Sequence, residues 1–429
     1  MPRVRDFLAS STSLVLSQLL TAGVGFVFWL IASRTFSQSD VGFASAVTSG
    51  MSLVGAVGAM GLGTLLIREI PAHPGREIAI VTTSLVASAA VGGVLGLGFV
   101  LIAPLLSVDF APLRESLITI VLVTLGASVT AASLVLDQAL IGLLRSGLQL
   151  FRNVLAALLR LLLLAMFASF ALASAGLGMI APWVISTGLS LVVLALIAGR
   201  RGNLRAAYPF HWEFLGQQWL ASLQHHMLNL AIQVPGWAMP IVAVTALSAS
   251  SNAGFFLAWQ LVGIAAFVQV AFTWILFAEA SREPGSLARW GWLTLRLSIV
   301  TGVGSAVALW ILGPIVLRIF GRGYSDAGTE ALFALPLTVI GGVFKGQYIT
   351  IQRVRGHLSS ATRLVALGAL IEILGGYLGA TAGGLRGLGI GVAVAMGLEV
   401  LPMLPVIYRE IIRPQIQARR PRVQEGREE

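Results

Sequence analysis

Charged side chains inside long apolar segments are the residues of this sequence most able to do chemistry. Six of them interrupt or border runs of about twenty apolar residues, namely Asp137, Arg160, Arg296, Lys345, Glu372 and Glu399. A charge at the centre of a lipid bilayer costs about 2.5–3.5 kcal/mol on insertion scales. We therefore expect these groups to face water, one another or a ligand instead of lipid.

Lys345 is the only lysine of the chain and its deepest positive charge. Thr338 and Gln352 lie seven residues to either side of it, so the three share a helical face, with Tyr348 beside them. Two interpretations stay open at this point. Lys345 either pairs with a carboxylate such as Glu372 or Glu399, or it contacts an anionic substrate.

Three carboxylates are candidates for coupling transport to a proton or cation. Glu372 and Glu399 are the strongest, because a carboxylate held away from water can exchange a proton during transport. Asp137 is the third, although it lies eight residues before Arg145 and can simply neutralise nearby arginines. Arg160 lies about two turns inside its apolar segment, where it lines a cavity or extends toward the membrane surface.

Uncharged polar residues mark two further helical faces. Asn229 and Gln233 follow His225 and His226 at spacings of three or four, so this face lines a hydrated cavity or hydrogen-bonds a neighbouring helix. Gln18 makes a milder polar face in the first apolar segment. Asn229, Gln233, Gln18 and Tyr348 are our candidates for uncharged substrate contacts.

The composition of the chain indicates that transmembrane helices hold these residues. The sequence has 429 residues, of which 57% are hydrophobic and 11% charged, whereas a soluble domain is about 25% charged. Its apolar blocks number about twelve and centre near residues 22, 54, 92, 129, 163, 188, 236, 266, 303, 341, 372 and 398. We predict an all-α polytopic membrane protein with about twelve transmembrane helices.

Several classes of protein are excluded by residue counts. The chain has no cysteine, and its five histidines lack zinc-site spacing, so we expect neither a metal nor a cofactor. Lys345 stands in Phe344-Lys345-Gly346, which lacks the Gly-Lys-Ser/Thr of a phosphate-binding loop, so the chain is not a P-loop ATPase. The net charge of +10 forms no basic stripe with interleaved aromatics, so we expect no nucleic-acid partner. The sequence predicts a transporter and not an enzyme.

Positive charge predicts the orientation of the helices. If the N-terminus is cytoplasmic, 20 of the 28 basic residues fall in cytoplasmic segments and five fall outside. Arg3 and Arg5 precede an apolar run over 11–33, which is longer than the core of a cleaved signal, so we expect it to be the first span. We predict a multi-pass protein of a bacterial inner membrane with both termini in the cytoplasm.

Two internal matches indicate that the chain is a duplicated half. Residues 35–43 align with 247–255 at an offset of 212 from Gly42 to Gly254, and 176–180 align with 387–391 at an offset of 211. Six spans per half put the symmetry axis along the membrane normal. We predict six-helix bundles over 1–198 and 225–408 around a central cavity, a cytoplasmic linker over 199–224 and a basic cytoplasmic tail over 409–429.

Four stretches of the first half resemble a known transporter family. They run from Ser17-Gln18-Leu19 to Arg34-Thr35-Phe36, then Asp40-Val41-Gly42-Phe43-Ala44, Gly61-Leu62-Gly63 and Leu66-Ile67-Arg68-Glu69-Ile70-Pro71. They are similar to the start of the polysaccharide transporter family, the O-antigen and capsule flippases of the multidrug/oligosaccharidyl-lipid/polysaccharide exporter superfamily. The Gly-Leu-Gly openings at Gly176 and Gly387 are similar too.

This resemblance implies alternating-access movement of undecaprenyl-diphosphate-linked oligosaccharide across the inner membrane. Lys345 and Arg160 would contact the diphosphate, and Asn229, Gln233 and the other polar candidates would contact sugar. Membrane lipids would be partners, as would a polysaccharide polymerase and glycosyltransferases. Two alternatives remain open: a multidrug or cation antiporter of the same superfamily, which would use Glu372 and Glu399 for cations, and a membrane scaffold of a polysaccharide assembly complex.

Overall fold

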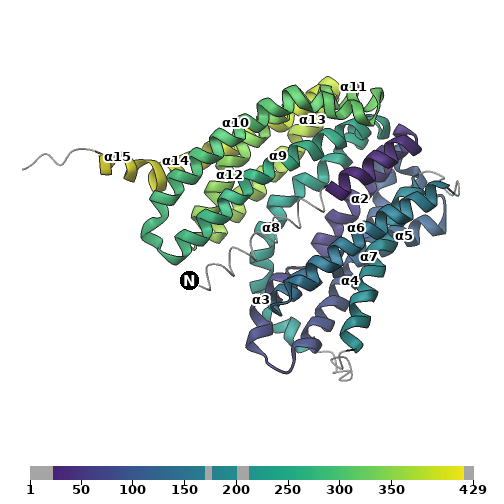
Figure 1. Ribbon diagram of the computed structural model, residues 1–429, viewed down its shortest axis with the longest axis horizontal. Coiled ribbons are helices and arrows are strands. Elements are labelled where there is room, and N and C mark those ends of the chain that lie inside the picture. Colours follow the sequence, from purple (N-terminus) through teal and green to yellow (C-terminus); the bar gives the residue numbers. More distant parts are fainter. Residues whose placement is uncertain (1–22, 170–175, 201–211, 420–429) are drawn as a thin grey trace, which may run out of the picture. The chain divides into compact units, whose positions relative to one another are not determined.

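The computed structural model describes residues 23–169, 176–200 and 212–419 of the chain, and these segments are helical with no strand among them (Figure 1). The apolar helix Gly23–Thr35 comes first. The helices that follow it up to residue 200 are α2 (Gln38–Gly58), α3 (Leu62–Ala72), α4 (Glu77–Leu106), α5 (Leu117–Gly142), α6 (Ser146–Ser169) and α7 (Leu177–Arg200), with the short helix η1 (Val108–Leu113) before α5.

The remaining helices follow from residue 212. They are α8 (Trp212–Ala246), α9 (Ala249–Arg282), α10 (Leu287–Phe320), α11 (Arg322–Leu332), α12 (Pro336–Val354), α13 (Leu358–Val400), α14 (Leu404–Ile407) and α15 (Arg413–Arg419), with short helical turns η2 (Pro284–Ser286), η3 (Leu401–Met403) and η4 (Tyr408–Ile412). Helix α8 therefore takes in residues 212–224, the described end of the segment expected to be a linker.

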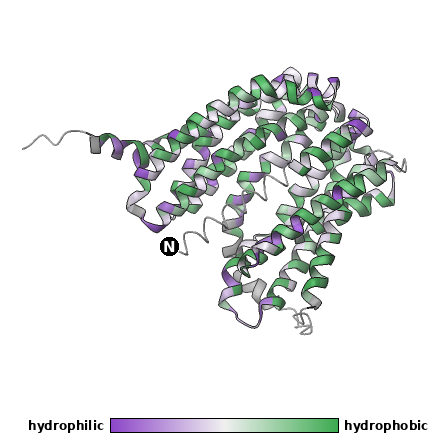
Figure 2. Cartoon of the chain, in the orientation of Figure 1, coloured by the Kyte–Doolittle hydropathy of each residue, from purple (hydrophilic) through white to green (hydrophobic). Residues whose placement is uncertain are grey.

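Apolar residues predominate along the long helices (Figure 2). Large apolar side chains stay exposed along them, such as Val94 and Leu105 of α4, which are 71% and 73% exposed. A soluble helix would turn such residues toward a core, whereas a helix in lipid can leave them outside. Among the described residues nine helices qualify as membrane spans by length and composition, or ten if α11 and α12, bent by 50°, form one broken span. The predicted all-α polytopic membrane fold is confirmed.

Helix α13 is a hairpin of two antiparallel arms. The turn lies at Gly383 (φ −149°, ψ 28°) and Gly384 (φ 61°, ψ −147°), neither of which has helical dihedrals. Two pairs of glycines hold the arms close together: Gly375 of the first arm packs on Gly391 of the second, and Gly379 packs on Gly387. The apolar stretch from Leu358 to Gln417 thus contains two spans. With helix Gly23–Thr35, this agrees with a bundle of about twelve helices.

The described residues form two compact units, which we describe separately. Unit 1 extends to Leu257 and includes Val316–Gly328, whereas unit 2 comprises Ala258–Ile315 and the chain from Thr329 onward. Helix α2 is the centre of unit 1, since every residue from Val41 to Met51 is buried, and it packs on α4, α5 and α8. The predicted division into bundles over 1–198 and 225–408 stays a prediction.

A serine caps the helix in each copy of the first internal repeat, but the two serines are one residue out of register with the alignment. Ser37 caps α2 by accepting a hydrogen bond from the Asp40 backbone N–H, and Ser248 caps α9 by accepting one from Ser251. Within unit 1 the copies also meet: Asn252 donates to the Gly42 carbonyl at 2.7 Å. The serine hydroxyl before each helix satisfies a backbone N–H that the helix itself leaves unpaired. Both copies therefore lie at a serine-capped helix start, although the capping serines are not aligned positions.

The turn of the α13 hairpin gives a test of this fold. Gly384 has dihedrals that only glycine adopts readily, so Gly384→Ala should lower the free energy of unfolding by about 1–3 kcal/mol. Gly383→Ala is the matched control, because its φ is negative and an added Cβ at either glycine has open space around it. Thermal unfolding of the full chain in detergent measures both; equal stability of the two variants would contradict the hairpin turn.

Candidate functional site

A lysine and two glutamates form a buried cluster inside unit 2. Lys345 comes from the middle of α12, Glu372 from the first arm of α13 and Glu399 from the second. The Lys345 Nζ lies 2.8 Å from Glu372 Oε1 and 2.9 Å from Glu399 Oε2. The three residues are only 7%, 2% and 2% exposed. Lys345 therefore pairs with both of the glutamates that the sequence offered as its partners.

The charges of this cluster do not balance. One ammonium faces two carboxylates, so the cluster carries one excess negative charge when all three groups are ionised. The second carboxylate oxygen of Glu399, Oε1, is buried and has no hydrogen-bond partner within the described segments. Uncompensated charge is costly in a medium of low polarity. One proton or one monovalent cation would neutralise the cluster, so the arrangement can take up and release a single positive charge.

Gly368 makes room for the cluster. It lies one turn before Glu372 on the first arm of α13, and a Cβ added there would collide with the carboxylate of Glu399. Any larger residue would push this carboxylate away from Lys345. The glycine of the first arm thus fixes where the glutamate of the second arm can lie.

The polar face predicted around Lys345 on α12 is buried within unit 2. Thr338 and Gln352 are each 6% exposed, and Tyr348 is 2% exposed. Gln352 donates a hydrogen bond to the Tyr348 hydroxyl at 3.0 Å. Tyr348 therefore has an internal partner, and its predicted contact with substrate sugar stays a prediction.

Asp137 belongs to a second ion pair, in unit 1, whose arginine is buried and whose carboxylate is half-buried. Arg152 of α6 donates to both of its carboxylate oxygens, from Nε to Oδ1 at 3.0 Å and from Nη2 to Oδ2 at 2.6 Å. The same guanidinium donates to Ser133 and to the side-chain oxygen of Asn153. A bidentate pair with further hydrogen bonds satisfies both charges. The predicted role of Asp137 in ion coupling stays a prediction.

Arg160 is half-buried and differs from the charges above, because it stacks on an aromatic ring. Its guanidinium carbon lies 3.4 Å from the centroid of the Trp183 ring, so α6 and α7 hold it together. Its Nε is buried and forms no hydrogen bond within the described segments, and no carboxylate pairs with it there. Arg296 of α10 makes a looser version of this contact, 5.8 Å from the Trp292 ring.

The uncharged candidates are placed less tightly. Asn229 is half-buried and Gln233 is exposed, and the Gln233 amide donates to the Asn229 carbonyl at 3.4 Å. His226 on the same helix is buried against the Ala56 carbonyl at 3.0 Å. Gln18 lies outside the described residues. Among the described residues no group of three or more histidines and acids is arranged to hold a metal ion.

Sequence reasoning missed Arg152 and Gly368. Arg152 was counted among the basic residues of the cytoplasmic segments, but it is 3% exposed and paired with Asp137. Fifteen residues separate the two across a chain reversal, so helical periodicity could not have linked them. Gly368 carries no signal of its own, since many spans contain glycine.

Comparison with solved structures identifies the fold. The inward-facing form of a multidrug resistance MATE family transporter of the MOP superfamily has a TM-score of 0.68 at 18% identity, covering 91% of this chain and 94% of that one. The fold is that of the MATE transporters. The outward-facing form gives a TM-score of 0.62 at 17% identity over 95% and 96% of the two chains.

A third structure shares this fold. It is a MOP superfamily transporter from Pyrococcus furiosus Vc1 (DSM3638), with a TM-score of 0.60 at 16% identity over 95% of this chain and 96% of that one. Reverse polarity of its binding pocket is described as suggesting a different function for that protein. The sequence matches no protein-family profile and no curated protein.

Removal of the lysine should destabilise the cluster. Lys345→Ala leaves two carboxylates buried side by side, so we expect it to lower the free energy of unfolding by about 3–5 kcal/mol. The variant carrying Lys345→Met, Glu372→Gln and Glu399→Gln together removes all three charges and should recover most of this loss. Thermal unfolding in detergent measures both. A triple variant as unstable as the single one would mean that Lys345 acts by packing and not by charge.

Gly368 can be tested by a double-mutant cycle with Glu399. Gly368→Ala should cost about 1–3 kcal/mol of stability, because its Cβ overlaps the Glu399 carboxylate. In a Glu399→Ala background that collision is absent, so the same change should cost much less. Gly397→Ala is the control, since an added Cβ there meets nothing. Equal costs of Gly368→Ala in both backgrounds would show that the glycine does not position Glu399.

Proposed function

We propose that this chain is an alternating-access transporter that moves a lipid-linked oligosaccharide, carrying its diphosphate, across a bacterial inner membrane. The chain is similar to both an inward-facing and an outward-facing structure, which supports a mechanism that alternates between these two states. The resemblance of its first half to polysaccharide transporters supports the substrate class. Such a protein has both termini in the cytoplasm in the orientation that the basic residues favour.

The state of the buried charges carries this proposal. The carboxylates of Asp137, Glu372 and Glu399 are each engaged by a basic side chain. Arg160, in contrast, is a cation whose guanidinium has no acidic partner in the described part of the chain. Of these four side chains, the one without a partner of opposite charge is thus positive. A guanidinium binds a phosphate group through two parallel hydrogen bonds, and its stacking on Trp183 keeps its plane fixed.

The physical needs of the substrate agree with this chain. A diphosphate and its sugars cannot cross hydrocarbon unaided, whereas a polyprenyl tail dissolves in it. The protein must therefore supply polar groups for the head alone. Arg160 supplies the anion contact. Asn229 and Gln233, on the helix that contains Pro235 and Pro240, supply hydrogen bonds to sugar.

The Lys345 cluster gives such a transporter a means of coupling. Its single excess negative charge can be neutralised by one proton or one monovalent cation, and neutralisation weakens the hold of the carboxylates on Lys345. Because Lys345 joins α12 to both arms of α13, this change alters how three helical segments are held together. The cluster thereby links an ion to a helix rearrangement.

A multidrug or cation antiporter is the second candidate, and the same cluster favours it. Two carboxylates against one ammonium offer a site for a cation. Two of the structures reported above are of a multidrug resistance transporter. The Pyrococcus furiosus protein, whose reverse pocket polarity suggests a different function, supports the idea that this fold is not tied to one substrate charge.

Arg160 distinguishes the two candidates. For a flippase, Arg160→Ala should reduce translocation of a polyprenyl-diphosphate oligosaccharide at least about tenfold, since a hydrogen bond to a charged group is worth roughly 1.5–3 kcal/mol. Arg160→Lys keeps the charge but loses the planar contact with Trp183, so it should retain part of the activity. The measurement is flipping of labelled substrate by the full chain in proteoliposomes.

Arg296→Ala is the matched control for this experiment, because Arg296 also lies over a tryptophan ring but is exposed. It should leave flipping unchanged. Wild-type activity of Arg160→Ala would overturn the assigned anion contact. Efflux of a cationic dye that is unaffected by Arg160→Ala and is lost in Glu372→Gln and Glu399→Gln, with no oligosaccharide flipping, would favour the antiporter.

A further inference from the structure

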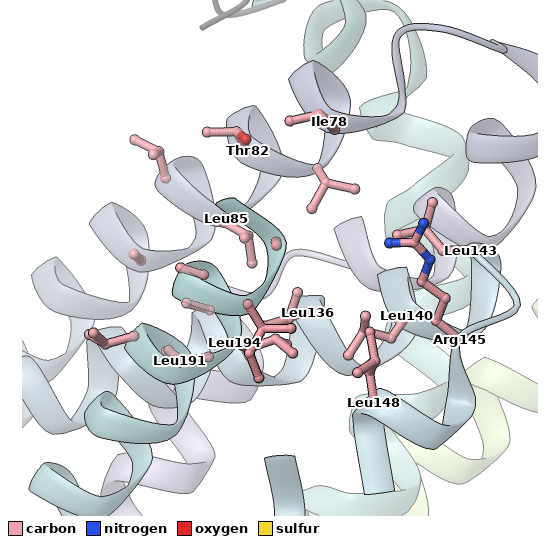
Figure 3. Close-up of a pocket in the computed structure, with 18 of the residues that line it drawn as sticks. Ile78, Thr82, Leu85, Leu136, Leu140, Leu143, Arg145, Leu148, Leu191 and Leu194 are labelled. Atoms are coloured by element: carbon pink, nitrogen blue, oxygen red, sulfur yellow. The ribbon is translucent and has the colours of Figure 1, made fainter. Parts of the chain in front are cut away.

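Unit 1 contains a large apolar pocket that the proposed transport mechanism does not use. Its volume is about 850 Å³, and its walls come from α4, α5 and α7 and from the connection between α5 and α6 (Figure 3). Leu85 of α4, Leu136 of α5 and Leu194 of α7 line it, with Leu140 and Leu191 farther along. All three helices qualify as membrane spans, so this pocket lies beside segments that contact lipid.

Among the described residues, the only two charged ones that line the pocket are of opposite sign. Glu77 is the first residue of α4, and Arg145 ends the connection between α5 and α6. They form no ion pair with each other or with any other residue of the described segments. Arg145 is exposed, and Figure 3 shows its guanidinium beside Leu143. The pocket thus joins a long apolar surface to one anionic and one cationic group.

We propose that this pocket binds a phospholipid whose head carries both a phosphate and a primary ammonium. An acyl chain fits the leucine-lined walls, and the volume lies within the roughly 300–1,000 Å³ typical of ligand pockets. Arg145 binds the phosphate through its planar N–H groups, and Glu77 accepts hydrogen bonds from the ammonium.

The pairing of charges selects this lipid from others. A phosphoglycerol head offers Glu77 only uncharged hydroxyl donors and no cation. A phosphocholine head is zwitterionic, but its quaternary nitrogen has no N–H to donate to a carboxylate. A head with a phosphate and a primary amine satisfies both Arg145 and Glu77. This inference concerns a bound lipid and does not depend on which substrate the chain transports.

Lipid competition with the full-length chain tests the proposal. We expect native mass spectrometry of the detergent-solubilised protein, given equal amounts of phosphatidylethanolamine, phosphatidylglycerol and phosphatidylcholine, to show at least about threefold more bound phosphatidylethanolamine than either other lipid. Ala195→Trp fills the pocket from an exposed position on α7 and should reduce binding of all three lipids severalfold. Leu196→Trp is its control, since Leu196 is 61% exposed and does not line the pocket.

The head-group contacts are tested separately. Arg145→Gln should reduce binding of all phospholipids, and Glu77→Gln should remove the preference for phosphatidylethanolamine over phosphatidylcholine. Arg76→Gln, the neighbouring arginine outside the pocket, should change neither. Equal binding by wild type and Ala195→Trp would overturn the pocket as the site. Preference for phosphatidylglycerol, or a preference unchanged in Glu77→Gln, would overturn the zwitterionic head.

Discussion

Hydrocarbon offers no hydrogen-bond partner to a charge or to a peptide group, and the structure follows from this constraint. Backbone groups are satisfied inside helices, so the described segments consist of helices joined by short connections. Buried charges are satisfied by one another: Lys345 by two glutamates, and Asp137 by Arg152. Arg160 stands apart because its partner is the ring of Trp183, which stabilises a cation without neutralising it.

The Lys345 cluster depends on glycines as much as on its charged groups. The turn at Gly383-Gly384 reverses the chain, and the close contact of Gly375 with Gly391 lets the two arms of α13 lie side by side. Only then do Glu372 and Glu399, which lie 27 and 54 residues beyond Lys345, reach the same ammonium. The contacts of Lys345 with two residues distant in sequence thereby depend on one chain reversal within α13 and on the packing of α12 beside it.

Much of the fold could be predicted from the sequence, because apolar runs of span length are a strong signal. The expected centres near 372 and 398 fall in the two arms of the α13 hairpin, and Glu372 and Glu399 were the carboxylates named as partners of Lys345. The pairing of Arg152 with Asp137 could not be predicted, since it depends on how α5 and α6 pack after the chain reverses. The short helices α3 and α11 were missed because they lack the length that marks a span.

The Lys345 cluster and Arg160 are suited to different tasks. An ammonium that already holds two carboxylates must release one of them before it can contact an anionic ligand, and release leaves a buried charge uncompensated. A guanidinium stacked on tryptophan pays no such cost, since its Nε has no partner to lose. Of the two cations first considered as anion contacts, Arg160 is therefore the better suited to substrate. Lys345 is better suited to registering a proton or cation through the glutamates that surround it.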